Sequence, residues 1–213
     1  MDYTSSIHEL RLQLYNLVYS TWLENLFSPQ WFLLVGLVIG MYVTWWLLVD
    51  KTRLRTLLLY GSLLAVSRVI LDIVVAINLG RWVYSVTLLP MAPDIFVHDL
   101  TVTPLTYMMV YQYSHTWKQF WVANLIGSGL IFYVMLPLFE YLKIFKGFPE
   151  WTLTDSFLVV FLAAGVMRAI MLLIERTEEK AQSKVSHSKT ALASLIAQPA
   201  LKPTENDDGD NEK

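Results

Sequence analysis

The chain has 213 residues, of which 55% are hydrophobic and 16% are charged, and it contains no cysteine. Soluble domains carry roughly 25% charged residues, so this composition excludes an ordinary soluble domain and favours a membrane protein. The lack of cysteine excludes disulfides, thiolate catalysis and Cys-ligated metals. The formal net charge of −2 provides no basic surface for nucleic acid, and we expect no nucleic-acid partner.

The first 27 residues have the pattern of an amphipathic helix. Ser6 and Glu9 have the spacing of a capping box, and apolar residues then recur at helical spacing. We predict that residues 1–27 form a helix lying at the membrane interface. A helix packed on the bundle is the alternative. The start of the chain lacks the basic region of a signal peptide, so we expect no cleavage.

Five later segments have the length and hydropathy of transmembrane helices. A hydrocarbon core of about 30 Å needs roughly 20 helical residues. The predicted spans cover residues 29–49, 57–79, 94–113, 119–142 and 153–174. The third span is the least hydrophobic, and Pro104 is expected to kink it. The predicted fold class is therefore all-α, a polytopic membrane protein with about five transmembrane helices.

The segments outside these spans differ in composition. Residues 81–93 contain Pro90 and Pro93 and are predicted to form a loop. Residues 175–213 are charged and rich in serine, and they end in an acidic run. Such a composition buries too little apolar area to offset the loss of chain entropy on folding. We therefore predict a disordered cytoplasmic tail over residues 175–213.

The basic residues predict the orientation of the spans. Eight Lys and Arg residues lie beside one set of helix ends and four beside the other. The larger set is Lys51, Arg53, Arg55, Lys118, Arg176, Lys180, Lys184 and Lys189, and the smaller is Arg11, Arg81, Lys143 and Lys146. Basic residues accumulate on the cytoplasmic side, which places the N-terminus outside and the C-terminus in the cytoplasm.

Two charged residues lie within the second predicted span. Arg68 and Asp72 are four residues apart and share one face of a helix. A charge near the bilayer centre costs roughly 2.5–3.5 kcal/mol, so each needs a partner. We interpret them as a structural pair, with a site for a transported ion, proton or ligand as the alternative. Replacing Asp72 alone by Ala is expected to destabilise the protein by roughly 3 kcal/mol.

Further polar residues lie at a matching depth in the third predicted span. At a rise of ~1.5 Å per residue, Asp72 and Asp99 lie at similar depths and can meet. We predict a polar cluster within the membrane, formed by Arg68, Asp72, Asp94, His98 and Asp99. Asp94, His98 and Asp99 are also ligand types that zinc or manganese accepts. No second histidine lies in the predicted spans, so we predict neither a metal nor a cofactor.

Two features near the ends of other spans have simpler interpretations. Arg168 lies close to the cytoplasmic end of the fifth predicted span, where its side chain can reach the interface. An aromatic group ends the third span and is interpreted as an interfacial belt. Its members are Tyr107, Tyr111, Gln112, Tyr113 and Trp117.

Signatures of catalysis are missing from the sequence. It has no P-loop, no zinc-protease motif and no G-x-S-x-G motif. We therefore predict a non-enzymatic protein for binding, small-solute passage or assembly, with no catalytic residues. The alternative is an embedded enzyme that uses Asp72, His98 and Asp99. The expected partners are the lipid bilayer and, as a further alternative, other membrane proteins or a second copy of the chain.

The segment from residue 93 to residue 120 carries a resemblance. It contains Asp99, Pro104, Tyr107, Met108, the Tyr-Gln-Tyr of residues 111–113, Trp117 and Lys118. This segment resembles an uncharacterised family of small membrane proteins in endospore-forming Gram-positive bacteria. The resemblance implies five helices and a bacterial cell membrane, and it implies no reaction. Family members tend to place Glu-Pro in the fourth helix, whereas this chain has Leu136-Pro137 and a displaced Glu140.

Overall fold

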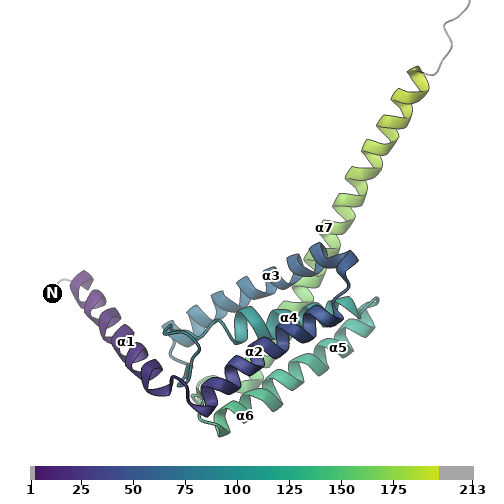
Figure 1. The fold of residues 1–213 in the computed structure, drawn as a ribbon. Coiled ribbons are helices and arrows are strands. Elements are labelled where there is room, and N and C mark those ends of the chain that lie inside the picture. Colours follow the sequence, from purple (N-terminus) through teal and green to yellow (C-terminus); the bar gives the residue numbers. More distant parts are fainter. Residues whose placement is uncertain (1–2, 197–213) are drawn as a thin grey trace, which may run out of the picture. The chain divides into compact units, whose positions relative to one another are not determined.

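A computed structural model describes residues 3–196, with side-chain burial defined as far as residue 185. Helices make up most of the described chain, and two short strands form its small sheet (Figure 1). The predicted all-α fold of a polytopic membrane protein is confirmed. The chain divides into two compact units, Met1–Met171 and Leu172–Lys213, and the features that define the candidate site lie in the first.

Helix α1 spans Tyr3–Asn25, and none of its residues is buried. The indole Nε1 of Trp22 donates to the carbonyl of Leu88 at 3.1 Å, and Asn25 Nδ2 donates to the carbonyl of Ser85 at 3.3 Å. Its C-terminal part is therefore attached to the loop that follows the second predicted span, while its apolar side chains remain exposed.

The next two spans begin with clear capping signals. Helix α2 spans Pro29–Leu48, and the Ser28 hydroxyl accepts a hydrogen bond from the backbone N–H of Trp31. Asp50 caps the short 3₁₀ helix η1, Lys51–Arg53, by accepting from Thr52. Helix α3 spans Leu54–Leu71 and continues as the π-helical segment η2, Asp72–Asn78.

The segment predicted as the third span is helical but shorter than expected. It consists of the π-helical segment η3, His98–Val102, followed by α4, Thr103–Gln112. Asp94 lies in the loop before it rather than at its first turn. Most residues of α4 are buried by protein, which explains the low hydropathy of this span. Pro104 falls in the first turn of α4, directly after the π-helical segment η3.

The fourth span is one helical run with a π-helical centre. It comprises α5, Trp117–Leu130, then η4, Ile131–Met135, and α6, Leu136–Tyr141. Thr116 and Gln119 form a capping box at its start. Gly127 lets α4 approach closely, because a Cβ at this position would lie 3.4 Å from the side chains of Thr106 and Val110.

Helix α7 spans Leu153–Ile196 and begins at a cap in which Asp155 accepts from the backbone N–H of Thr152 at 2.7 Å. It continues past residue 174, where the predicted span ends. Glu, Lys, Arg, Ala and Gln predominate from Glu175 to Lys184, and these are strong helix formers. The structure therefore differs from the predicted disordered tail as far as Ile196, and the remainder of that prediction concerns residues outside the described range.

Four helical runs in the described part of the chain are long and apolar enough to cross a membrane. They are Pro29–Leu48, Lys51–Asn78, Trp117–Tyr141 and Leu153–Val185. Large apolar side chains such as Leu47, Val66 and Leu130 are exposed on their outward faces. Exposed apolar stripes on long helices are expected where lipid, rather than water, surrounds the protein.

Contacts between connecting segments define two ends of the bundle. Strand β1, Trp82–Tyr84, pairs antiparallel with β2, Phe145–Gly147, so two distant loops lie together at what we call the sheet end. At the opposite end, Gln112 Nε2 donates to the carbonyl of Leu48 at 2.9 Å, and its Oε1 accepts from the backbone of Asp50 at 2.8 Å. The run of η3 and α4 thus connects the sheet end with the opposite end.

Candidate functional site

Arg68 is the centre of a buried group of charges that we call the Arg68 triad, formed by Arg68, Asp72 and Asp99. Arg68 lies in the last turn of α3, Asp72 begins η2, and Asp99 lies in η3. The Nη2 atom of Arg68 lies 2.9 Å from Asp72 Oδ1 and 3.1 Å from Asp99 Oδ1. The predicted contacts are present, and Arg68 joins two helices of the bundle.

The triad is almost completely enclosed. Both carboxylates are 0% exposed and Arg68 is 7% exposed. An unpaired charge in such surroundings is strongly unfavourable, so the guanidinium stabilises both carboxylates and they stabilise it. Asp72 and Asp99 both lie in π-helical turns. This backbone form is rare in proteins as a whole but occurs often at functional sites.

The triad does not satisfy all of its own hydrogen-bonding groups. Within the described part of the chain, Asp72 Oδ2, Asp99 Oδ2 and Arg68 Nη1 have no hydrogen-bond partner. Two carboxylates also face a single guanidinium, so the group is not charge-balanced when both are ionised. Removing the charge of Arg68 therefore leaves two carboxylates together, whereas removing the charge of one aspartate leaves one ion pair.

His98 is buried among aromatic rings rather than placed between carboxylates. Its ring centroid lies 5.3 Å from that of Tyr84 and 5.6 Å from that of Phe139. In the described residues no three His, Asp or Glu side chains are grouped so as to hold a metal ion. Asp94, His98 and Asp99 therefore share one region without converging on a metal position.

Asp94 occupies a different environment, in the loop that precedes η3. Its side chain is only 2% exposed. The backbone N–H groups of Phe96 and Val97 donate to its carboxylate, which fixes the side chain in place. Its Oδ1 atom has no hydrogen-bond partner among the described residues, although buried carboxylate oxygens are usually paired.

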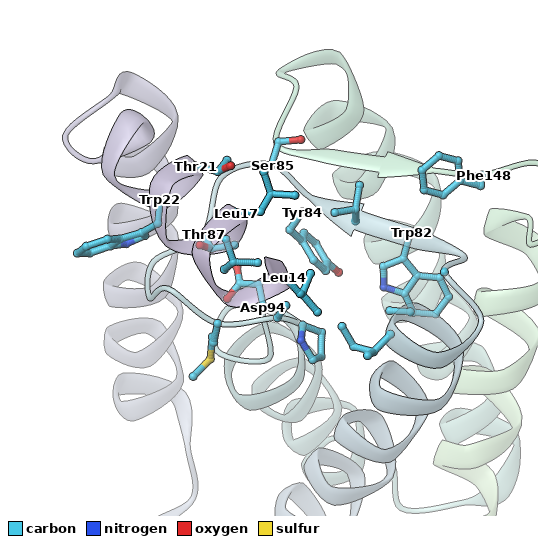
Figure 2. A pocket seen from close by; sticks show the side chains of 18 residues that line it. Leu14, Leu17, Thr21, Trp22, Trp82, Tyr84, Ser85, Thr87, Asp94 and Phe148 are labelled. Carbon is cyan, nitrogen blue, oxygen red and sulfur yellow. The ribbon is translucent and has the colours of Figure 1, made fainter. Parts of the chain in front are cut away.

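Asp94 lines a pocket at the sheet end, which we call the sheet-end pocket. The pocket has a volume of about 430 Å³ and lies between α1, the end of η2 and the loop carrying β1 (Figure 2). Pockets of this size commonly hold small ligands. Its lining includes Leu14, Leu17, Trp22, Ile77, Trp82, Tyr84, Asp94 and Phe148.

The sheet-end pocket and the Arg68 triad are adjacent but separate. Of the five residues in the predicted polar cluster, only Asp94 lines the pocket. Tyr84 links the two, because it lines the pocket and its ring packs on His98. Burial raises the pKa of Tyr84 well above its usual value, so its hydroxyl stays neutral. The pocket therefore lies against the buried charges without opening onto the triad itself.

Sequence reasoning missed most of the pocket lining. Trp82 and Tyr84 fall in the predicted loop of residues 81–93, and residues 1–27 were predicted to lie at the interface, with a helix packed on the bundle as the alternative. The buried side chain of Trp82 interacts with the Asp72 carboxylate. The aromatic start of the loop was the available signal. Its pairing with β2, more than fifty residues further along the chain, left no local pattern.

Arg168 is buried, and the prediction that its side chain reaches the interface is wrong. Its Nη2 donates to the carbonyl of Ser114 at 3.0 Å. Its guanidinium lies over the rings of Phe120, Tyr111 and Trp117, at 4.6, 5.4 and 5.3 Å. The aromatic residues predicted as an interfacial belt supply part of this cage. Arg168 thereby fixes the first part of α7 to the turn between α4 and α5.

A second buried polar group joins three helices. Tyr107 and Ser128 share a hydrogen bond of 2.5 Å, and the Ser128 hydroxyl donates to Asn124 Oδ1 at 3.1 Å. Asn124 Nδ2 then donates to the carbonyl of Phe161 at 3.0 Å. This chain of hydrogen bonds links α4, α5 and α7 and is internally satisfied, which indicates a structural role.

The fold and the site together define an all-α polytopic membrane protein with a buried charge triad beneath a small pocket. Comparison with known proteins finds no matching family, no similar curated protein and no similar solved structure. The resemblance of residues 93–120 to a bacterial family stays a prediction. Inference about function therefore rests on the geometry of the sheet-end pocket.

Proposed function

We propose that this protein is a non-enzymatic binding protein of the cell membrane that holds a small molecule in the sheet-end pocket. In this proposal the chain crosses the membrane five times, with the sheet end outside and the C-terminus in the cytoplasm. Support comes from the Lys and Arg distribution and from the run of η3 and α4, which connects the two ends of the bundle.

The observation that carries the proposal is the lining of the pocket. Apolar and aromatic side chains surround Asp94, whose buried Oδ1 has no hydrogen-bond partner within the described residues. Ligand pockets combine mostly apolar walls with a few fixed polar groups, and this arrangement fits that description. A purely structural site would pair this oxygen atom with the protein.

The same geometry favours binding over catalysis. An embedded enzyme would use Asp72, His98 and Asp99, and none of these lines the pocket. The Arg68 triad instead joins η2 to η3, the segments on either side of the loop that forms the pocket wall. The triad therefore supports the pocket and does not act on its contents.

The lack of cysteine provides a direct test. Ser85 lines the pocket, is exposed, and differs from cysteine by one atom, so Ser85→Cys introduces a unique thiol there. The rate of its reaction with a water-soluble maleimide is measured in phosphatidylglycerol vesicles. We expect at least one of three small phenyl compounds to slow the reaction: benzyltrimethylammonium, its neutral isostere 2,2-dimethylpropylbenzene, or phenylacetate.

A matched control separates binding from general effects of the compounds. Glu150→Cys places the thiol at the sheet end but outside the pocket, where Glu150 is 61% exposed. Its reaction rate should not change with any compound. If none of the three compounds slows labelling of Ser85→Cys relative to Glu150→Cys, the proposed function is wrong.

A further inference from the structure

We infer that the sheet-end pocket selects an organic cation, a molecule with an apolar body and an ammonium-type head that lies against Asp94. This inference rests on the proposed function and adds the chemical class of the ligand. Three independent features of the pocket support it: the fixed carboxylate, the sign of the surrounding charge, and the aromatic walls.

The first feature is the Asp94 carboxylate. Asp94 lines the pocket, and two backbone N–H groups, of Phe96 and Val97, hold its carboxylate. Its buried Oδ1 has no hydrogen-bond partner among the described residues. A fixed acceptor needs no reorganisation when a donor or a cation arrives. Preorganised groups of this kind bind more tightly because they lose little freedom on binding.

The second feature is the balance of charge around the pocket. Asp94 is the charged residue among the described lining residues, which include no Lys, Arg or His. Behind it, Asp72 and Asp99 both lie against Arg68. Three carboxyl groups therefore accompany one guanidinium in this region. Burial raises the pKa of Asp94 to about 7, and a cation lying against it would favour its ionised form. The resulting potential attracts a cation and repels an anion.

The third feature is the number of aromatic side chains. Trp22 of α1, Trp82 and Tyr84 of β1, and Phe148 after β2 all line the pocket (Figure 2). Aromatic rings attract cations through their quadrupoles, and ammonium groups that carry several methyls are recognised in this way. The remaining walls, including Leu14, Leu17 and Ile77, suit the apolar body of such a molecule.

The entry side of the pocket agrees with an amphiphilic ligand. Helix α1 contributes one wall of the pocket, and none of its residues is buried. An amphipathic helix of this kind suits the membrane interface, where amphiphilic cations also accumulate. A free ammonium compound and the ammonium headgroup of a lipid present the same chemistry to Asp94, and the experiment distinguishes these two sources.

The test compares the three phenyl compounds on Ser85→Cys in vesicles of phosphatidylglycerol alone. Benzyltrimethylammonium and 2,2-dimethylpropylbenzene have the same shape and differ in charge. We expect the cation to halve the labelling rate at a concentration about tenfold lower than its isostere, and phenylacetate to have the least effect. Slower labelling after phosphatidylcholine is added to the vesicles identifies the lipid headgroup as a source, and an unchanged rate identifies the free cation.

Asp94→Asn in the Ser85→Cys background removes the charge and preserves the shape. The preference for the cation over its isostere should fall to about equal binding. Continued protection by the neutral isostere shows that this variant is folded. Glu150→Gln removes a carboxylate at the same end outside the pocket and should leave the preference intact.

Each outcome decides one of the two claims. Equal protection by the cation and the isostere, a preference for phenylacetate, or a cation preference that survives Asp94→Asn overturns the ligand class and leaves the pocket function standing. Protection by none of the compounds overturns the proposed function itself. If Asp94→Asn does not fold, the comparison of the three compounds on the unaltered Asp94 still decides the ligand class.

Discussion

Arg68 lies between two carboxylates where α3 changes into the π-helical η2. From the sequence alone, Arg68 and Asp72 form a coupled pair, and Asp99 lies at a matching depth. In the structure Asp99 remains, so losing one aspartate leaves a balanced pair, and losing Arg68 leaves two buried carboxylates together. The stability changes expected for substitutions at Arg68, Asp72 and Asp99 therefore differ from those expected for a simple ion pair.

We predict that Arg68→Leu destabilises the protein more than Asp72→Asn or Asp99→Asn. Removing one partner of a buried ion pair typically costs about 3–5 kcal/mol, and here it leaves two like charges. The free energy of unfolding is measured in detergent for each variant. Adding both Asn substitutions to Arg68→Leu should restore much of the loss, and equal losses for the three single variants would contradict the triad.

A second residue-scale prediction concerns Arg168. Arg168→Gln should lower the free energy of unfolding by about 2 kcal/mol, because a charged hydrogen bond to the Ser114 carbonyl and contacts with three rings are lost. Lys118→Gln removes a charge from an exposed position near the same turn and serves as the control. Similar losses for both variants would argue against the buried cage.

Sequence reasoning predicted side-chain contacts correctly where they follow from spacing within one helix or from matching depths in two helices. The spacing of Arg68 and Asp72 and the depth of Asp99 predicted their contact. The cage around Arg168 could not be predicted in this way, because its rings come from α4 and α5 and meet only after the helices pack. The sheet-end pocket depends on pairing between β1 and β2 and on the attachment of α1, neither of which has a local sequence pattern.

At the scale of elements, hydropathy located the long helices closely. The predicted span over residues 29–49 matches α2, Pro29–Leu48. The π-helical segments were not predicted. The helix predicted over residues 94–113 is shorter in the structure, where η3 and α4 cover His98–Gln112 and are largely buried by protein. The extension of α7 reflects helix propensity in a charged segment.

Glycines on two packed helices give an element-scale prediction. A Cβ at Gly165 of α7 would collide with the ring of Trp121 on α5, whereas one at Gly129 would meet nothing within 4 Å. Gly165→Ala should destabilise the protein by about 1–3 kcal/mol through overpacking. Gly129→Ala should be neutral or stabilising by up to about 1 kcal/mol. Thermal unfolding in detergent compares them, and equal effects would contradict the α5–α7 contact.

At the scale of the whole molecule, the two ends of the bundle should face opposite sides of the membrane. A membrane-impermeant maleimide applied to intact cells should label Ser85→Cys at the sheet end. Lys118→Cys, at the opposite end, should react only after the cells are permeabilised. The opposite result would invert the orientation, and labelling of both in intact cells would reject the proposed topology.

The central claim is that the sheet-end pocket binds an organic cation through Asp94. Equilibrium binding of radiolabelled benzyltrimethylammonium to the purified protein tests it most directly, with Asp94→Asn and Glu150→Gln measured in parallel. The account predicts saturable binding that is retained in Glu150→Gln and weakened about tenfold or more in Asp94→Asn. Binding that does not saturate, or that is the same in all three proteins, would contradict it.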